Sequence, residues 1–286
     1  MALIMGLFII THVHAGPKDF DRNMDVAPPG FIKGGTQSKP VASSPAGPSE
    51  SAPSHTSSNH AVDQSQLHWT YEDPAEWGDL DPKYHLCKDG KRQSPIDIND
   101  STYANLGNIN FKYRSGPKEI LNNGHTIQVN MLNGSYITVS GKRYELLQFH
   151  FHSPSEHTIN GKPAAMVMHF VHQANDGQLA VIAVLMERCK ANGTIDQLWK
   201  RLPDKVGQKK KLSRRISIQS LIPGNHDYYS YSGSLTTPPC SEGVNWMVLK
   251  RPMEVSAPQI EAFTSLFPKS VRPLQERYHR PVRSRN

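Results

Sequence analysis

Two histidines separated by one residue are the feature of this sequence that most directly suggests metal chemistry. Residues 147–152 read LQFHFH. Alternate side chains of a β-strand project from the same face, so His150 and His152 on a strand point the same way and can share one metal ion. Phe149 and Phe151 then face the opposite, buried side. The two histidines are also compatible with an ordinary polar pair on a strand.

A hairpin expected further along the chain brings a third histidine to this pair. Residues 160–161 are Asn-Gly, a strong signal for a two-residue hairpin turn. A turn centred there places His152 opposite His169, with Cβ atoms roughly 5 Å apart, and puts Glu156 on the same face. Three histidines with an open fourth position are the ligand set of a catalytic zinc site rather than a structural one. Pro154 interrupts the ladder, so the register could include a bulge.

The elements that must position these histidines are mainly strands. Runs that alternate or are rich in β-formers occur at residues 126–130, 136–139 and 179–185. Turn signals separate them at residues 122–124, 133–134 and 175–177. Helical patterns are short and occur at residues 195–202 and 258–267. These patterns predict a mainly β (α+β) domain at 67–286, a mostly antiparallel sheet with short peripheral helices.

The first 66 residues have a different character. Residues 2–10 form an apolar run that is too short to span a bilayer, and residues 13–15 (Val-His-Ala) could be a cleavage site. We therefore interpret residues 1–15 as a signal peptide, although no Lys or Arg precedes the apolar run. The alternative is the apolar N-terminus of a cytosolic protein. Residues 16–66 are rich in Pro, Ser, Gly and Ala, which predicts a disordered linker.

The charged residues are unevenly distributed. The chain has a formal net charge of +7, yet residues 1–66 contain four Lys or Arg and five Asp or Glu. Basic residues cluster at 205–215 and again at 269–285, and we expect a solvated loop and a frayed end respectively. Neither cluster has interleaved aromatic residues, so no nucleic-acid partner is expected. Weak association with a surface or membrane through these clusters remains open.

The three cysteines bear on the compartment. They are Cys87, Cys189 and Cys240, and no CxxC pair exists, which excludes a cysteine zinc knuckle. One disulfide plus one free thiol would suit this count and would fit an oxidising compartment. With the signal peptide, this predicts an exported protein that is periplasmic or secreted.

Several sequence blocks occur in the order found in the α-class carbonic anhydrases. They are QSPIDI at 93–98, NNGH at 122–125, QFHFHSPSEH at 148–157, HFVH at 169–172, YSGSLTTPPC at 231–240 and VNW at 244–246. The stretch RPLQ at 272–275 also resembles the family's C-terminal region. Residues 67–278 thus resemble a carbonic anhydrase of the secreted or bacterial type, and ordered matches of this length are more specific than any single motif.

The resemblance implies a fold, a metal and a reaction. The fold is a large twisted, mainly antiparallel sheet with short helices around it. Zn²⁺ lies in a conical cleft, held by His150, His152 and His169. The reaction is the reversible hydration of carbon dioxide to bicarbonate and a proton, by attack of zinc-bound hydroxide. Zinc makes hydroxide available at neutral pH because it lowers the pKa of bound water from 15.7 to about 7.

Three further residues match catalytic positions of the family. Thr236 matches the threonine that accepts a hydrogen bond from the hydroxide, and Glu156 matches the carboxylate that accepts the threonine's proton. His125 matches the proton shuttle, a role that suits an imidazole because its pKa is near 6.5. By itself, each of these residues would be read as a surface or core residue without a catalytic role.

The resemblance also assigns the surroundings of the site. The apolar pocket for carbon dioxide corresponds to Val171, Val181, Leu235 and Trp246, and Thr237 also belongs to the substrate-binding set. Gln148 stands where the family places the amide partner of the first histidine. Asn123 and Tyr71 are further candidates for support around the site. Cys87 and Cys240 match the family's disulfide, which leaves Cys189 as a free thiol.

One position departs from the family pattern. Two residues before the third ligand the family usually has a Glu that orients the imidazole, and this sequence has Val167. Partners of this kind commonly change metal affinity or activity by 10–100-fold. We therefore expect zinc to bind less tightly here than in a typical member.

Two other functions compete with the enzyme. A carbonic anhydrase-like binding module that has lost catalysis would typically have lost zinc ligands, whereas this chain keeps all three. A surface tether is the second alternative, suggested by the linker and the basic clusters. It is compatible with catalysis. Monomer and homodimer both remain open.

Overall fold

The structure is a computed structural model that describes residues 69–114 and 116–285. Residues 1–15 and 16–66, for which a signal peptide and a linker are predicted, lie outside the described residues, and the domain boundaries stay predictions. None of the described helices is long and apolar enough to cross a membrane.

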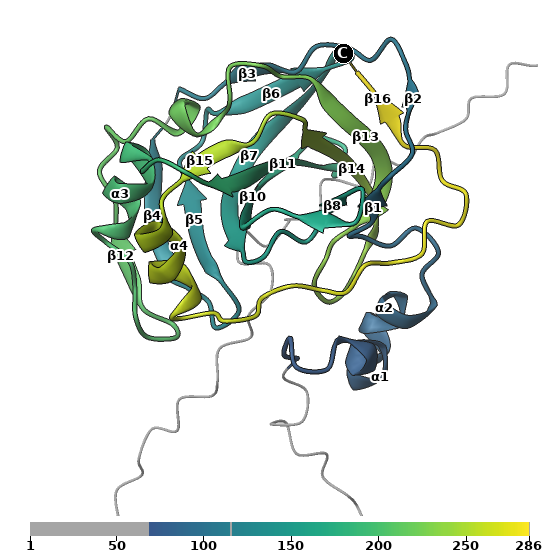
Figure 1. The fold of residues 1–286 in the computed structure, drawn as a ribbon, viewed down its shortest axis with the longest axis horizontal. Coiled ribbons are helices and arrows are strands. Elements are labelled where there is room, and N and C mark those ends of the chain that lie inside the picture. The colour runs from purple at the N-terminus through teal and green to yellow at the C-terminus, as the bar shows by residue number, and fades with distance from the viewer. Residues whose placement is uncertain (1–68, 115, 286) are drawn as a thin grey trace, which may run out of the picture.

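A large mixed sheet forms the body of the domain (Figure 1). Its main path runs in the order β12-β4-β5-β7-β10-β11-β14-β13-β16-β2, and β3, β6 and β15 pair beside it. The strands of this sheet are β2 Thr102–Tyr103, β3 Asn110–Lys112, β4 Pro117–Asn122, β5 Ile127–Met131, β6 Tyr136–Val139, β7 Lys142–His152, β10 Met166–Gln173, β11 Leu179–Arg188, β12 Lys209–Lys211, β13 Tyr228–Ser234, β14 Glu242–Leu249, β15 Met253–Val255 and β16 Arg283–Ser284. The mainly β fold class is therefore confirmed, with the three parallel pairs β11–β14, β11–β15 and β16–β2 added to an otherwise antiparallel sheet.

Short helices lie around the sheet, as predicted. The α-helices are α1 Trp77–Leu80, α2 Leu86–Asp89, α3 Gly193–Trp199 and α4 Ala257–Thr264, and 3-10 turns occupy Pro74–Glu76, Pro82–Tyr84 and Ile218–Leu221. The two helices expected from the sequence correspond to α3 and α4. Asn192 caps α3, because its side chain accepts hydrogen bonds from the backbone of Thr194 and Ile195.

The hairpin register between β7 and β10 differs from the prediction by two residues. His169 pairs with His150, and His152 pairs with Val167. The turn itself is where the sequence places it, since β8 Thr158–Ile159 pairs with β9 Lys162–Pro163 around it. Between the pair His152–Val167 and the pair Thr158–Pro163, the first strand of the hairpin has five intervening residues (153–157) and the second has three (164–166), which accounts for the two-residue shift. Because side chains alternate with a period of two, a shift of two residues leaves all three histidines on one face.

The two faces of the sheet bury different sets of residues. Phe149 and Phe151 are fully buried, as expected from their alternation with the histidines, and belong to the main hydrophobic core under α3 and α4. A second apolar cluster lies on the histidine side and includes Val171, Val181 and Trp246. The sheet therefore separates a structural core from the face that carries the site.

The C-terminal basic segment is not the frayed end that the sequence suggested. Arg272 and Arg280 are buried, and residues 283–284 form β16 beside β13. The guanidinium of Arg272 donates to Gln93 Oε1 at 2.8 Å and to the carbonyl oxygens of Ser94 and Cys87 at 2.9 and 2.8 Å. Paired guanidinium groups can be buried, and that pairing could not be read from the basic composition.

The basic segment at 205–215 is likewise more ordered than expected. Lys209–Lys211 form β12, which pairs with β4 and ends the sheet. Lysine is common on edge strands because its charge opposes pairing with another chain.

The disulfide implied by the resemblance is present. Cys87 and Cys240 are joined, and Cys189 is free and exposed. The bond ties the N-terminal helices α1 and α2 to the end of the segment that follows β13, across a separation of 153 residues.

Buried His172 makes stability depend on pH. Its ring is fully buried against the hydroxyl of Tyr113, 2.7 Å from Nε2, and burial lowers its pKa to about 3. In the unfolded chain the same group titrates near 6.5. Between these values the unfolded state binds more protons, so stability falls as the pH falls from about 6.5 to about 3.

We predict that His172→Gln removes this contribution. The free energy of unfolding of the variant, measured in urea between pH 6.5 and 4, should fall less steeply than that of the parent, by up to about 1.4 kcal/mol per pH unit. The exposed His279 changed to Gln serves as the control. If the free energy of unfolding changes equally with pH in the His172 variant and in the parent, His172 is not the source of the pH dependence.

Candidate metal centre

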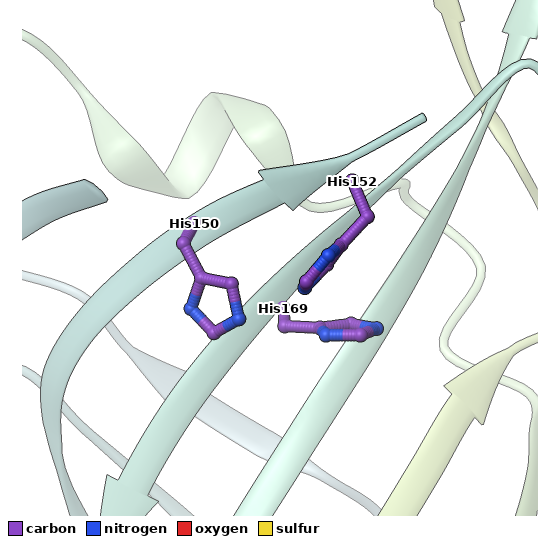
Figure 2. A group of neighbouring side chains, drawn as sticks. All are labelled: His150, His152 and His169. Carbon is purple, nitrogen blue, oxygen red and sulfur yellow. The ribbon is translucent and has the colours of Figure 1, made fainter. Parts of the chain in front are cut away.

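Three histidine side chains converge on the face of the sheet opposite the main core (Figure 2). His150 and His152 come from β7 and His169 from the neighbouring strand β10. One nitrogen from each lies within 4.8 Å of the other two. His152 and His169 are buried, whereas His150 is only partly buried. The cluster is therefore held by the protein on one side and reachable on the other.

Hydrogen bonds fix the orientation of two of the rings. Nδ1 of His150 lies 2.9 Å from Gln148 Oε1, the amide expected there, and Nδ1 of His152 lies 2.6 Å from the carbonyl oxygen of Ser270. A carbonyl oxygen can only accept, so these Nδ1 atoms carry the protons. Both Nε2 atoms are then unprotonated and available to a metal, and such outer partners also raise ligand basicity.

The third ring lacks an equivalent partner. Nδ1 of His169 and Nε2 of His152 lie 3.7 and 3.6 Å from Glu156 Oε2, so the two nitrogens face the same space. Nε2 of His169, the other ring nitrogen, is buried and has no hydrogen-bond partner among the described residues. Val167, two residues earlier on the same face, has no polar atom to offer.

The electrostatics of the cluster favour neutral imidazoles. Burial lowers the pKa of His150 and of His169 well below the ordinary value, and the neighbouring His152 lowers both further. Neutral imidazole is the form that binds a metal ion. Three such nitrogens with an open side fit Zn²⁺, whose catalytic sites use three protein ligands. One of the three, His152 Nε2, is buried and has no hydrogen-bond partner among the described residues, which fits a metal ligand.

Glu156 is held beside the histidines by the C-terminal segment. Its Oε1 accepts a hydrogen bond from the backbone N–H of Arg272 at 3.0 Å. Thr236 is buried in the segment after β13, but within the part of the chain that the structure describes it forms no hydrogen bond to Glu156. The expected link between these two side chains thus stays a prediction.

The apolar residues expected to bind carbon dioxide do gather beside the histidines. Val171, Val181, Leu235 and Trp246 share one buried cluster. Val181 pairs with Val171 on one side and with Trp246 on the other. The Trp246 ring lies 4.9 Å from that of His169. An apolar wall therefore borders the ligand set on the side of β11 and β14, and half-buried Thr237 follows at its end.

His125 lies in a turn that Asn123 stabilises. The Asn123 side-chain oxygen accepts hydrogen bonds from the backbone of His125 and Thr126 at 3.0 and 2.8 Å. The His125 ring stacks on Trp69, with centroids 3.6 Å apart. Tyr71 lies edge-on to both His125 and His152, at 6.5 and 6.4 Å. Tyr71 thus lies between the expected shuttle and the ligand set.

Two contributors were missed by reasoning from sequence. Ser270 orients His152 through a main-chain carbonyl, and Arg272 holds Glu156 through a main-chain N–H. Neither interaction has a side-chain signature, because any residue carries these backbone groups. The block RPLQ at 272–275 points to the region but not to the contacts.

Comparison with known proteins agrees with the fold and the site. Residues 72–286 match the family of eukaryotic-type carbonic anhydrases. A carbonic anhydrase of Pectobacterium carotovorum is 44% identical over 203 residues, covering 70% of this chain and 83% of the relative. One of Neisseria gonorrhoeae is 42% identical over 208 residues, covering 71% and 82%.

Solved structures show the same similarity. The α-carbonic anhydrase of Thermovibrio ammonificans, in complex with the inhibitor sulfanilamide, is 47% identical with a TM-score of 0.74, covering 76% of this chain and 98% of that one. A hyperthermostable carbonic anhydrase from a hydrothermal vent chimney is 48% identical with a TM-score of 0.74, covering 77% and 100%.

The sheet and its three-histidine centre place this chain in the carbonic anhydrase class of zinc lyases. The chain belongs to the family of eukaryotic-type, or α-class, carbonic anhydrases. It is thus an enzyme of carbon dioxide hydration, and zinc is its cofactor.

We predict that Val167→Glu slows the loss of zinc. A carboxylate at this position would give Nε2 of His169 the partner that it lacks. Zinc transfer to a chromogenic chelator should become roughly 10-fold slower or more. Val167→Leu, which adds bulk without an acceptor, is the control. An unchanged rate in the Glu variant would contradict this reading of the departure.

We also predict that Arg272 supports the centre indirectly. Losing its three side-chain hydrogen bonds in Arg272→Gln should loosen the main chain at 270–272, which contacts both His152 and Glu156. Zinc loss to the chelator should accelerate several-fold, and Arg272→Lys should be intermediate.

Arg280→Gln is a matched control for this prediction. The guanidinium of Arg280 donates to four carbonyl oxygens, those of Gln93, Ser232, Glu276 and Arg277, and its main chain does not contact the histidines. Equal acceleration in the Arg272 and Arg280 variants would show that general loss of stability, rather than positioning, governs zinc retention.

Proposed function

We propose that His150, His152 and His169 hold the zinc ion of a carbon dioxide hydratase, and that residues around them perform the steps below. Bound zinc supplies Lewis acidity, which lowers the pKa of water to about 7. Gln148 and the carbonyl of Ser270 keep two of the imidazoles in the metal-binding tautomer.

The substrate is bound by the apolar wall. Carbon dioxide has no net dipole, so Val171, Val181, Leu235 and Trp246 offer it a suitable surface beside the metal. Thr237 completes this set. Thr236 accepts a hydrogen bond from the attacking group and donates its own proton to Glu156, which directs a lone pair toward the carbon. His125 carries away the released proton.

The convergence of three ring nitrogens within 4.8 Å, next to an apolar wall, is the observation that carries this proposal. A buried cluster of neutral imidazoles without a metal would leave ring nitrogens unsatisfied at a cost in stability. The apolar wall beside the open side of the cluster offers a nonpolar surface that suits carbon dioxide.

We propose further that the catalytic domain spans residues 67–286, after a signal peptide at 1–15 and a linker at 16–66, and that the protein is exported to the periplasm or secreted. The disulfide Cys87–Cys240 supports an oxidising compartment. Association with a surface or membrane through the basic residues, and the choice between monomer and homodimer, stay predictions.

The test is zinc content and stopped-flow carbon dioxide hydration on the purified full chain. We expect about one zinc per chain, and we expect His150→Ala to abolish activity because it removes a ligand. His279→Gln, at an exposed histidine that is not one of the three clustered residues, should behave as the parent.

Two other results would overturn the proposal. Stoichiometric zinc without activity would indicate a binding module with a misplaced Thr236 or a defect at Val167. Neither zinc nor activity would mean that only the fold is shared with the family.

A further inference from the structure

Two lysines of β12, Lys209 and Lys211, lie on the same face of the sheet as the zinc ligands. Cross-strand partners share a face, and His169, His150, Gln128, Leu121 and Lys209 are successive partners across five neighbouring strands. Figure 1 shows these strands side by side, from β10 to β12. At about 4.8 Å per strand, Lys209 is about 14 Å from His150. Lys211 follows on the same face.

Apart from Leu121, the side chains in the interval between the centre and these lysines are polar. Gln128 Nε2 donates to Asn130 Oδ1 at 2.7 Å, and Asn130 Nδ2 donates to Glu119 Oε1 at 3.0 Å. Glu119 is the partner of Lys211 across the strands. The face therefore has an apolar half toward β11 and β14 and a polar half toward β12. The free-energy cost of losing hydration would be smaller for an ion that moves to or from the centre along the polar half.

The loop before β12 is joined to the turn that carries His125. Gly207 N–H donates to the carbonyl of Asn122 at 2.8 Å, and Asn122 N–H donates to that of Gln208 at 3.1 Å. Val206 lies against Gly124, where an added Cβ would come within 3.3 Å of its side chain. The charged loop is thus joined directly to the turn of the expected proton shuttle, in which His125 itself is buried.

The segment 205–215 has an excess of unpaired positive charge. Its exposed cations are Lys205, Lys209, Lys211, Arg214 and Arg215. None of these five forms an ion pair with a carboxylate of the described residues. Glu119 and Asp204 are the acidic residues in the adjoining segments, so the balance is positive. Clustered charges of one sign raise the local concentration of opposite ions over about 10 Å at ordinary ionic strength.

We propose that this cationic edge, formed by Lys205, Lys209 and Lys211, gathers anionic proton acceptors such as hydrogen phosphate at the mouth of the site. The inference rests on the proposed function, since hydration releases the proton that must be removed. The transfer is balanced: HPO₄²⁻ takes up that proton and leaves as H₂PO₄⁻, and no other bond changes.

Two buffers of similar pKa and different charge test the proposal. Turnover at saturating carbon dioxide is measured against phosphate concentration and, separately, against imidazole, whose basic form is neutral, at one low ionic strength. For the full-length zinc enzyme with Lys205, Lys209 and Lys211 all changed to Glu, the second-order rate constant for phosphate should fall about 5–10-fold. The constant for imidazole should not fall, and added salt should reduce the difference.

A matched variant controls for total charge. Arg188, Lys190 and Arg251 are exposed cations near the far end of β11, and changing all three to Glu should leave the response to phosphate unchanged. Replacing Lys205, Lys209 and Lys211 by Gln should give a smaller loss in the same direction as Glu.

Two outcomes would overturn the inference. If phosphate and imidazole respond alike in the Glu variant, the lysines only guard the edge strand against pairing. If the control variant loses phosphate response equally, net charge rather than this edge is responsible. A parent enzyme that is inactive in both buffers would instead refute the proposed function, so the two failures can be told apart.

Discussion

The register between β7 and β10 is the constraint on which the rest of the site depends. It sets His169 opposite His150, and the alternation of β7 adds His152 on the same face. A shift by one residue would send the histidine of β10 to the core side and bring Phe170 or Met168 to the site. The fully buried phenylalanines of β7 oppose such a shift, because their burial in the main core fixes which face is which.

The centre concentrates polar groups at a largely buried position, so the hydrogen-bond partner of each imidazole decides how firmly that ring is oriented. Each imidazole that must bind a metal needs a second partner to set its tautomer, and Gln148 and Ser270 provide this for two rings. His169 has a buried nitrogen without such a partner, since Val167 replaces the acceptor usual in the family. Val167 packs in the apolar cluster on the histidine side of the sheet, but its side chain cannot orient the imidazole of His169.

The two basic segments, alike in composition, have different physical roles. Near the C-terminus, Arg272 and Arg280 are buried among carbonyl oxygens and hold main chain that contacts the site or lies beside it. Lys209 and Lys211 of β12 are solvated and end the sheet on the face of the zinc ligands. Composition alone could not separate these cases, because burial of a cation depends on acceptors supplied by distant parts of the chain.

The sequence by itself determined the elements whose signals are local and the residues carried by ordered motifs. The alternation of residues 147–152, the turn at 160–161 and the short helices α3 and α4 follow from side-chain period and turn chemistry. Only the tertiary structure decided the two-residue register shift, since it depends on how the segment 153–157 is accommodated. The contacts of Ser270 and Arg272 were also decided there. They use backbone groups common to all residues, brought to the site by a segment more than 100 residues away, with separations of 118 and 116.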